Sequence, residues 1–233
     1  MKLKHLESLL QQVEPFTDPK IQLEQYQTSS HIAASILMSE VDAFEGKSVM
    51  DLGCGSGILT AGPLFLGADH VIGVDIDPDA LRICRRNLIR CFHDPDDGDD
   101  DDDPTGGERR GEGGATRTCA ARYDLMQGDV SRLGEVVRSE CRLVDCVIMN
   151  PPFGTRNPGI DISFLQAALS LTPTAVYSLH KSSTREGIRR RCSRLRVDME
   201  ILAELRFDLP ATYKFHHKKS SDVEVDFVRF TAQ

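Results

Sequence analysis

Residues 49–77, with the sequence VMDLGCGSGILTAGPLFLGADHVIGVDID, decide the fold. An apolar run ends at Leu52, the glycine-rich turn GCGSG of residues 53–57 interrupts it, and apolar residues resume as the start of a helix. A second short apolar run, His70 to Val74, leads to an acidic residue. The order strand, turn, helix, strand is a βαβ unit, so it predicts a parallel sheet.

The glycine-rich turn and the acidic residues beside it predict a nucleotide-like ligand. Glycine lets a ligand approach the backbone closely, and a carboxylate such as Asp75 at the next strand end can accept both ribose hydroxyls. The spacing G-x-G-x-G differs from the G-x-G-x-x-G of nicotinamide-binding folds. Together with Asp51, two residues before the turn, it favours S-adenosylmethionine, whose cationic methionine end Asp51 would face.

A third expected strand, 123–127, ends in Gly128-Asp129-Val130. Because parallel strands end at one crevice, Asp129 could accept from the adenine amine of the cofactor and Val130 could offer its backbone amide. The alternative is that Asp129 only caps a helix. Its place in series with the two earlier acidic strand ends favours the ligand-binding interpretation.

The tetrapeptide Asn150-Pro151-Pro152-Phe153 follows an apolar strand at 144–149 and indicates a chemistry. The Asn150 side-chain oxygen and the Pro151 carbonyl form a pair of acceptors for an exocyclic amine, and Phe153 could stack on a planar base. Taken alone, Asn-Pro can simply start a turn, and Phe is often a core residue. We therefore interpret residues 150–153 as catalytic only in the context of the cofactor motifs.

The remaining elements follow from periodicity and turn residues. Leucines at helical spacing predict a helix near the N-terminus, and Ser29 or Ser30 caps a second that extends to about residue 43, so residues 1–45 are expected to form a helical lid. The other expected strands and helices are 47–52, 57–67, 70–75, 77–91, 131–140, 161–171, 174–179 and 183–194, followed by an antiparallel hairpin at 197–206 and 222–231. The predicted fold is a single domain over 1–233: a doubly wound α/β sheet with an antiparallel last strand.

Charge is distributed unevenly along the 233 residues, whose formal net charge is −8. Residues 93–118 hold eight Asp and two Glu against three Arg, a net of −7, and are expected to be a disordered acidic insertion. Residues 181–219 hold eleven Lys or Arg against five Asp or Glu, a net of +6, which favours contact with nucleic-acid phosphates over an ordinary solvated face.

Cysteine usage and hydropathy exclude several classes. The seven cysteines contain no C-x-x-C pair, which argues against a disulfide framework and against a zinc site. No apolar run is long enough for a membrane span and no signal peptide is visible, so a soluble intracellular protein is expected. Cytosine C5 methylation would need a cysteine in place of Asn150.

Several long motifs in the same order resemble a known family. They are LEQYQT (23–28), DLGCGSGI (51–58), DID (75–77), VIMNPPFG (147–154), YSLHKSSTRE (177–186), AELRFDLP (203–210) and YKFH (213–216). These motifs resemble the eukaryotic methyltransferase-like enzymes that make N6-methyladenosine in small-subunit ribosomal RNA, within the class I S-adenosylmethionine-dependent methyltransferases. The resemblance covers nearly the whole chain apart from the acidic insertion.

The resemblance implies a seven-stranded Rossmann-like sheet, S-adenosylmethionine as cofactor and ribosomal RNA as substrate. It also implies an obligate small zinc-binding activator protein, docked by strand addition along Tyr123 to Gln127, and a location in the nucleus (nucleolus) and cytoplasm. By the same resemblance the cofactor site would be lined by Gln25, Thr28, Gly53, Ser56, Ile58, Asp75, Asp129 and Val130, in addition to Asp51 before the glycine-rich turn and Gly55 within it.

Three alternatives remain at the level of sequence. A release-factor glutamine methyltransferase uses a similar Asn-Pro-Pro motif, usually followed by Tyr. A guanine or cytosine amine in RNA is a second possible acceptor. A catalytically silent cofactor-binding scaffold is the third, although intact motifs argue against it.

Overall fold

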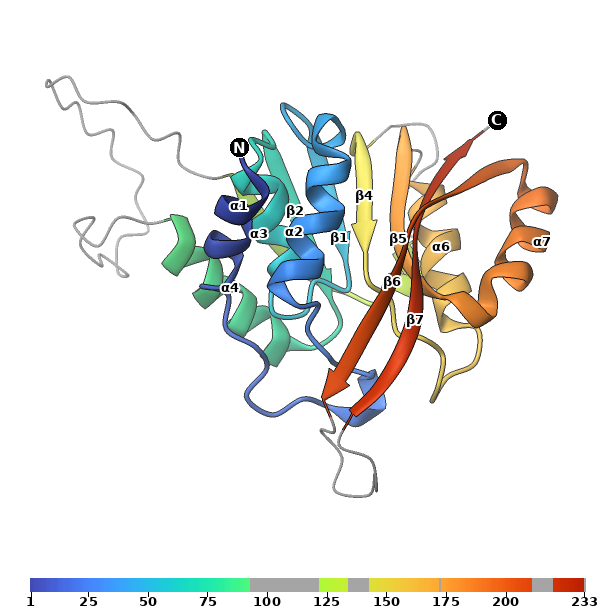
Figure 1. The fold of residues 1–233 in the computed structure, drawn as a ribbon, viewed down its shortest axis with the longest axis horizontal. Helices are drawn as coiled ribbons and strands as arrows, with labels where there is room; N and C mark the ends of the chain where they lie inside the picture. Colours follow the sequence, from blue (N-terminus) through green and yellow to red (C-terminus); the bar gives the residue numbers. More distant parts are fainter. Residues whose placement is uncertain (93–121, 134–142, 172, 211–219, 233) are drawn as a thin grey trace, which may run out of the picture.

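The computed structural model describes residues 1–92, 122–133, 143–171, 173–210 and 220–232. Within these residues one seven-stranded sheet has the order β3-β2-β1-β4-β5-β7-β6 (Figure 1). The strands are β1 Ser48–Leu52, β2 His70–Asp75, β3 Tyr123–Gln127, β4 Cys146–Met149, β5 Ala175–Lys181, β6 Val197–Pro210 and β7 Ser220–Ala232.

Strand directions follow from the connections. The strands β1 to β5 are mutually parallel, whereas β7 runs antiparallel to both β5 and β6. The predicted doubly wound sheet with an antiparallel last strand is therefore confirmed.

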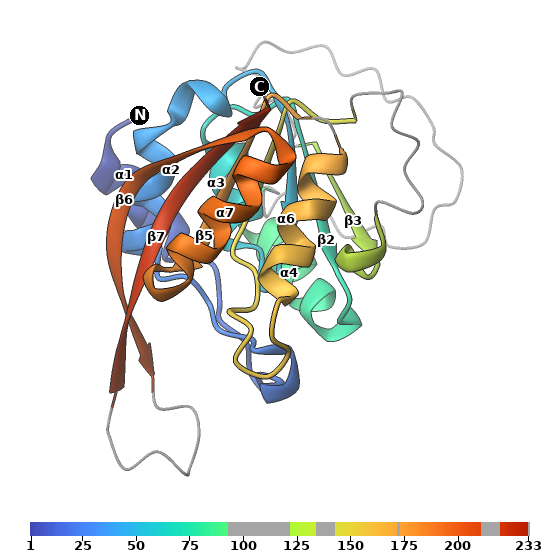
Figure 2. The ribbon, with the colours of Figure 1, turned by 90° about the vertical axis from the view of Figure 1, so that its right-hand side faces the viewer.

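Helices cover both faces of the sheet. They are α1 Leu3–Leu10, α2 Ser30–Ser39, α3 Ile58–Phe65, α4 Pro78–Phe92, α6 Ile160–Ser170 and α7 Arg185–Leu195, with 3-10 turns η1 Ile21–Leu23, η2 Val41–Ala43, η3 Val130–Arg132 and η4 Ser182–Thr184. The helices α1 to α4 contribute to one buried apolar cluster, while α6 and α7 pack against the opposite face (Figure 2). Adjacent residues Val49 and Met50 of β1 belong to different clusters, because side chains alternate along a strand.

Most expected boundaries agree with the structure to within one or two residues. Ser29 caps α2, since its side chain accepts a hydrogen bond from the Ile32 N–H at 3.3 Å. That helix ends at Ser39 and is followed by η2, rather than continuing to residue 43. The expected acidic insertion at 93–118 and most of the expected helix at 131–140 lie outside the described residues.

The sheet register brings the sequence motifs to one edge. Leu52 pairs with both Val74 and Met149, and Asp75 pairs with Gln127. The residues that follow these positions therefore leave the sheet side by side, as expected for the carboxyl ends of parallel strands. This edge carries the candidate site.

Candidate functional site

A cavity of about 290 Å³ lies at the carboxyl edge of the sheet. Its walls come from the glycine-rich turn, the ends of β2 and β3, the residues after β4 and the start of α6. The remaining wall is the N-terminal linker, residues 11–29 between α1 and α2, through Phe16 and residues 22–26. Of the segment expected to form a helical lid, the linker between α1 and α2 is the part that lines the cavity. The helices α1 and α2 themselves bury Leu6, Leu10 and other apolar residues in the core.

Gly53 and Gly55 of the glycine-rich turn line the cavity. Both have positive φ, 75° and 55°, a conformation that glycine adopts without strain. A Cβ at position 55 would lie 3.0 Å from the Phe16 ring. The absence of a side chain at Gly55 therefore allows Phe16 of the N-terminal linker to pack closely against the glycine-rich turn.

Asp75 is at the cavity wall and is held by backbone donors. Its Oδ2 accepts from the Gly55 N–H and its Oδ1 from the Asp77 N–H, both at 2.9 Å. The side chain is buried, and this burial raises the pKa of Asp75. Each oxygen keeps a lone pair for a ligand hydroxyl.

Asp51 lies behind this wall, fully buried in β1. Thr60 donates to its Oδ2 at 2.7 Å, but Oδ1 has no hydrogen-bond partner within the described residues. Burial raises the pKa of Asp51 to about 7, and the nearby Asp75 carboxylate adds to the rise. A buried carboxylate with an unused oxygen, two residues before a cavity-lining glycine, suits a cationic ligand.

Asp129 and Val130 both line the cavity. Asp129 also caps η3, since its Oδ1 accepts from the backbone N–H of Ser131 at 2.9 Å and from the Ser131 hydroxyl at 2.7 Å. The two interpretations made from the sequence are therefore compatible, because the cap occupies only one carboxylate oxygen. Ser131 joins them in the wall.

Gln25 is the only one of the remaining predicted cofactor residues in the described lining of the cavity. Thr28, Ser56 and Ile58 are buried, at 2%, 2% and 4% exposure. The Thr28 hydroxyl accepts from Asn150, and the Ser56 hydroxyl donates to Gln27 Oε1 at 3.0 Å. These three residues support the wall from behind.

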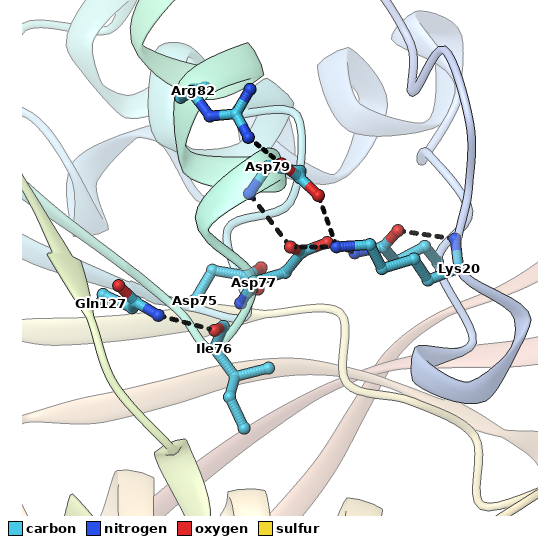
Figure 3. Close-up of polar contacts among 8 residues, drawn as sticks. Lys20, Asp75, Ile76, Asp77, Asp79, Arg82 and Gln127 are labelled. Atoms are coloured by element: carbon cyan, nitrogen blue, oxygen red, sulfur yellow. Dashed lines mark hydrogen bonds and ion pairs between the residues drawn. The ribbon is translucent and has the colours of Figure 1, made fainter.

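Lys20 ties the N-terminal linker to the loop after β2 (Figure 3). Its Nζ lies 2.5 Å from Asp77 Oδ1 and 2.6 Å from Asp79 Oδ2, and Asp79 also pairs with Arg82. Gln25 strengthens this link by donating to Asp77 Oδ2 at 2.7 Å. The pairing raises the pKa of Lys20, and contacts with Lys20 and Gln25 keep the pKa of Asp77 below its usual range.

Asn150 and Pro152 line the other end of the cavity, while Pro151 is buried. The Asn150 amide is held at both ends: Oδ1 accepts from the Tyr26 hydroxyl at 3.0 Å, and Nδ2 donates to Thr28 Oγ1 at 2.9 Å. Because β2 and β4 lie on either side of β1, Asp75 and Asn150 mark the two ends of the same cavity.

The Phe153 ring is 7% exposed and belongs to an aromatic cluster. The ring centroid of Phe153 lies 5.2 Å from that of Tyr26, 6.4 Å from that of Phe207 and 5.6 Å from Lys181 Nζ. The base platform expected from the sequence is therefore enclosed by neighbouring rings. Pro152 and Asn150 form the part of the motif that faces the cavity.

Several site residues were missed by the sequence analysis. Tyr26 and Phe164 line the cavity, Lys20 anchors the linker over it, and Phe207 comes from β6. The motif LEQYQT contains Tyr26 and could have marked it as a site residue. Its contact with Asn150, 124 residues away, could not be predicted from the local sequence.

The predicted basic surface is described only in part. In α7, Arg189, Arg190, Arg191 and Arg194 are exposed, while the second cluster at 216–219 lies outside the described residues. Arg189 pairs with Glu186 of the same helix. In the described ranges no group of three or more His, Cys, Asp or Glu could hold a metal ion.

None of the helices in the described part of the chain combines the length and the apolar character needed to cross a membrane.

Comparison with known proteins gives full-length relatives. The chain is 47% identical to the rRNA N6-adenosine-methyltransferase METTL5 of Danio rerio, over 99% of each chain. It is 39% identical to the corresponding Drosophila melanogaster protein, over 99% of this chain and 96% of that one. The crystal structure of protein PH1948 from Pyrococcus horikoshii matches with a TM-score of 0.74 and 30% identity, covering 100% and 98% of the two chains.

A family model described as ribosomal protein L11 methyltransferase (PrmA) matches residues 28–91. This segment contains the glycine-rich turn and Asp75, but it ends before Asn150. The match therefore includes residues that line the Asp75 end of the cavity, but it does not include Asn150.

Proposed function

Because this chain belongs to the family of rRNA N6-adenosine-methyltransferases, we propose that it transfers a methyl group from S-adenosylmethionine to the N6 amine of an adenosine in small-subunit ribosomal RNA. The observation that carries the proposal is one cavity lined by Asp75 at one end and by Asn150 and Pro152 at the other. One end suits a nucleoside cofactor and the other an exocyclic amine.

The residues present fit S-adenosylmethionine, which supplies an electrophilic methyl group when bound. Asp75 offers lone pairs to ribose hydroxyls, and Asp129 and Val130 lie in the wall where an adenine would be recognised. Asp51 Oδ1, which has no hydrogen-bond partner among the described residues, suits the cationic methionine end. Gly53 and Gly55 leave the backbone open to close approach.

The acceptor end can orient a weakly nucleophilic amine. The lone pair of an adenine amine is delocalised into the ring, so two acceptors for its hydrogens would turn that lone pair toward the methyl group. Asn150 Oδ1 and the Pro151 carbonyl are the acceptors that we assign. Alignment supplies much of the acceleration, and the proton can leave after transfer, so no dedicated general base is required.

The family relationship does not favour the alternatives. Three relatives that match over 95% or more of this chain are named for rRNA adenosine N6, not for a release-factor glutamine. A catalytically silent scaffold would have no need for an Asn150 amide held at both ends.

The activator protein that we propose would dock on β3. Within the described residues this strand is at one end of the sheet order and pairs only with β2, so its other edge is available there for strand addition. Met126 on β3 is 49% exposed. For the location we propose the nucleolus and the cytoplasm, where ribosomal subunits are assembled and completed.

The test is to incubate the full chain, with and without the activator, with methyl-labelled cofactor and either small-subunit ribosomal RNA or a release factor. We expect label in N6-methyladenosine of the RNA. Label in a glutamine side chain would overturn the proposed acceptor, label in guanine or cytosine would overturn the proposed base, and no label anywhere would support the scaffold.

A further inference from the structure

Tyr26 is the side chain that reaches from the N-terminal linker to the acceptor motif. Its hydroxyl donates to Asn150 Oδ1 at 3.0 Å, and it lines the same cavity. On the other side of the amide, Asn150 Nδ2 donates to the Thr28 hydroxyl at 2.9 Å. Two hydroxyls of one short linker segment thus hold both ends of the amide.

Among the described residues, one hydrogen-bonding position at each end of the Asn150 amide is unused. An amide oxygen has two lone pairs and the amide nitrogen has two N–H groups. Tyr26 uses one lone pair of Oδ1 and Thr28 one N–H of Nδ2, which fixes the plane of the amide. The second lone pair of Oδ1 remains for an incoming amine.

Tyr26 acts as a hydrogen-bond donor toward Asn150 Oδ1. Burial, together with the Glu24 carboxylate, raises the pKa of Tyr26 well above its ordinary value. The hydroxyl therefore keeps its proton throughout the physiological range and cannot serve as a general base. Its contribution is geometric.

The linker segment that carries Tyr26 is itself fixed on both sides. The Glu24 carboxylate accepts from the Arg156 N–H at 2.7 Å, and Gln25 donates to Asp77 at 2.7 Å. Gln27 accepts from Ser56 at 3.0 Å. Residues 24, 25 and 27 therefore fasten this segment to the loop after β4, the loop after β2 and the glycine-rich turn, respectively.

We propose that Tyr26 is a positioning residue for methyl transfer: its hydroxyl, opposed by that of Thr28, holds the Asn150 amide in the plane that receives the acceptor amine. This inference rests on the proposed function. It also assigns the Thr28 hydroxyl to Asn150 and not to the cofactor, in agreement with the absence of Thr28 from the described cavity lining.

The Tyr26→Phe variant tests the hydroxyl alone, since it keeps the ring contacts with Phe153 and Phe207. We expect the single-turnover rate of methyl transfer to fall about ten- to a hundredfold, as small misplacements of reacting groups do. The KM for RNA, the cofactor Kd and the melting temperature should stay close to those of the wild type. A merely structural role would lower the melting temperature and leave the rate of the folded fraction unchanged.

The matched control is Tyr177→Phe. It removes a comparable hydroxyl contact, that of Tyr177 with Glu40 Oε2 at 3.1 Å, from a residue outside the cavity. This control should transfer methyl groups at the wild-type rate. A wild-type rate for Tyr26→Phe, or a loss explained entirely by a weaker cofactor Kd, would overturn the proposal.

A second pair of variants approaches the amide from its other end. Thr28→Val removes the hydroxyl at nearly constant volume and should slow transfer without weakening cofactor binding, whereas Thr28→Ser should restore the rate. Weaker cofactor binding in Thr28→Val would return this hydroxyl to the cofactor site and count against the proposal. Label in another acceptor of the wild type would overturn the proposed function, and the Tyr26 comparison would then be made on that acceptor.

Discussion

The side-chain amide of Asn87 bonds to both backbone polar groups of Glu14. Its Oδ1 accepts from the Glu14 N–H at 3.1 Å, and its Nδ2 donates to the Glu14 carbonyl at 3.0 Å. The same Nδ2 donates to the Ser56 carbonyl at 2.8 Å. Because Asn87 is fully buried in α4, one side chain connects the N-terminal linker, the glycine-rich turn and this helix.

Replacing Asn87 with Ala should lower the free energy of unfolding by about 2 to 4 kcal/mol, because it removes the side-chain partner of the buried Ser56 carbonyl and of the half-buried backbone groups of Glu14. Ala is the better helix former, so the loss cannot come from helix propensity. Urea denaturation would measure it. Arg82→Ala, at an exposed position of the same helix, is the control and should unfold like the wild type. Equal unfolding of Asn87→Ala and Arg82→Ala would contradict this account.

Asp51 should make cofactor affinity depend on pH. Its pKa of about 7 in the folded protein exceeds the usual value of about 3.9, so the native state holds a proton that the unfolded state loses. Through this group, stability falls as pH rises through that window. A cationic ligand favours the ionised form, so the affinity for S-adenosylmethionine should increase between about pH 6 and 8. Because a single proton is released, the dissociation constant should fall by at most about tenfold for each pH unit.

Calorimetric titration of the cofactor at several pH values would show this dependence. In Asp51→Asn the affinity should be lower and its pH dependence smaller. The dependence that remains would be due to Asp75, whose pKa is also raised. Identical pH profiles for wild type and variant would rule out Asp51 as the titrating partner of the cofactor.

Local patterns predicted the fold and the acidic edge because both depend on short sequence distances. The turn after β1 and Asp75 belong to the same βαβ unit, and the carboxyl ends of its two parallel strands lie side by side. In contrast, the contacts of Tyr26 with Asn150 and of Glu14 with Asn87 join residues 124 and 73 positions apart. No periodicity encodes such pairs, because they depend on the path of the linker over the finished sheet.

Contacts between residues distant in the sequence also explain why the burial of Phe153 was not predicted. An aromatic residue after Asn-Pro-Pro is compatible with an exposed platform and with a core position, and local sequence does not distinguish them. Phe207 of β6 and Tyr26 of the linker, which are distant in the sequence, decide its burial.

Lys20→Met should loosen the N-terminal linker over the cavity. The substitution leaves the buried Asp77 carboxylate with Gln25 as its remaining side-chain donor. We expect a lower melting temperature and several-fold weaker cofactor binding. The pKa of Asp77 is lowered and that of Lys20 is raised, so the pair stabilises the fold above about pH 4 and below about pH 10.

Thermal unfolding at neutral pH and at about pH 3 would test whether the Lys20–Asp77 ion pair causes the loss of stability. The difference between wild type and Lys20→Met should be present at neutral pH and should shrink on acidification, as Asp77 takes up a proton. A difference that does not change with pH would point to packing of the Lys20 alkyl chain instead of its charge.

The two ends of the cavity should separate in mutant kinetics. Asp75→Ala removes the carboxylate that would receive ribose hydroxyls, so it should weaken cofactor binding about ten- to a hundredfold while methyl transfer at saturating cofactor is largely retained. Asn150→Ala removes an acceptor for the amine and should abolish detectable transfer with cofactor affinity unchanged. Equilibrium binding of the cofactor and single-turnover transfer to RNA, measured on both variants, would show the contrast. If Asn150→Ala lost cofactor affinity and Asp75→Ala lost only transfer, the two ends would be assigned in the wrong order.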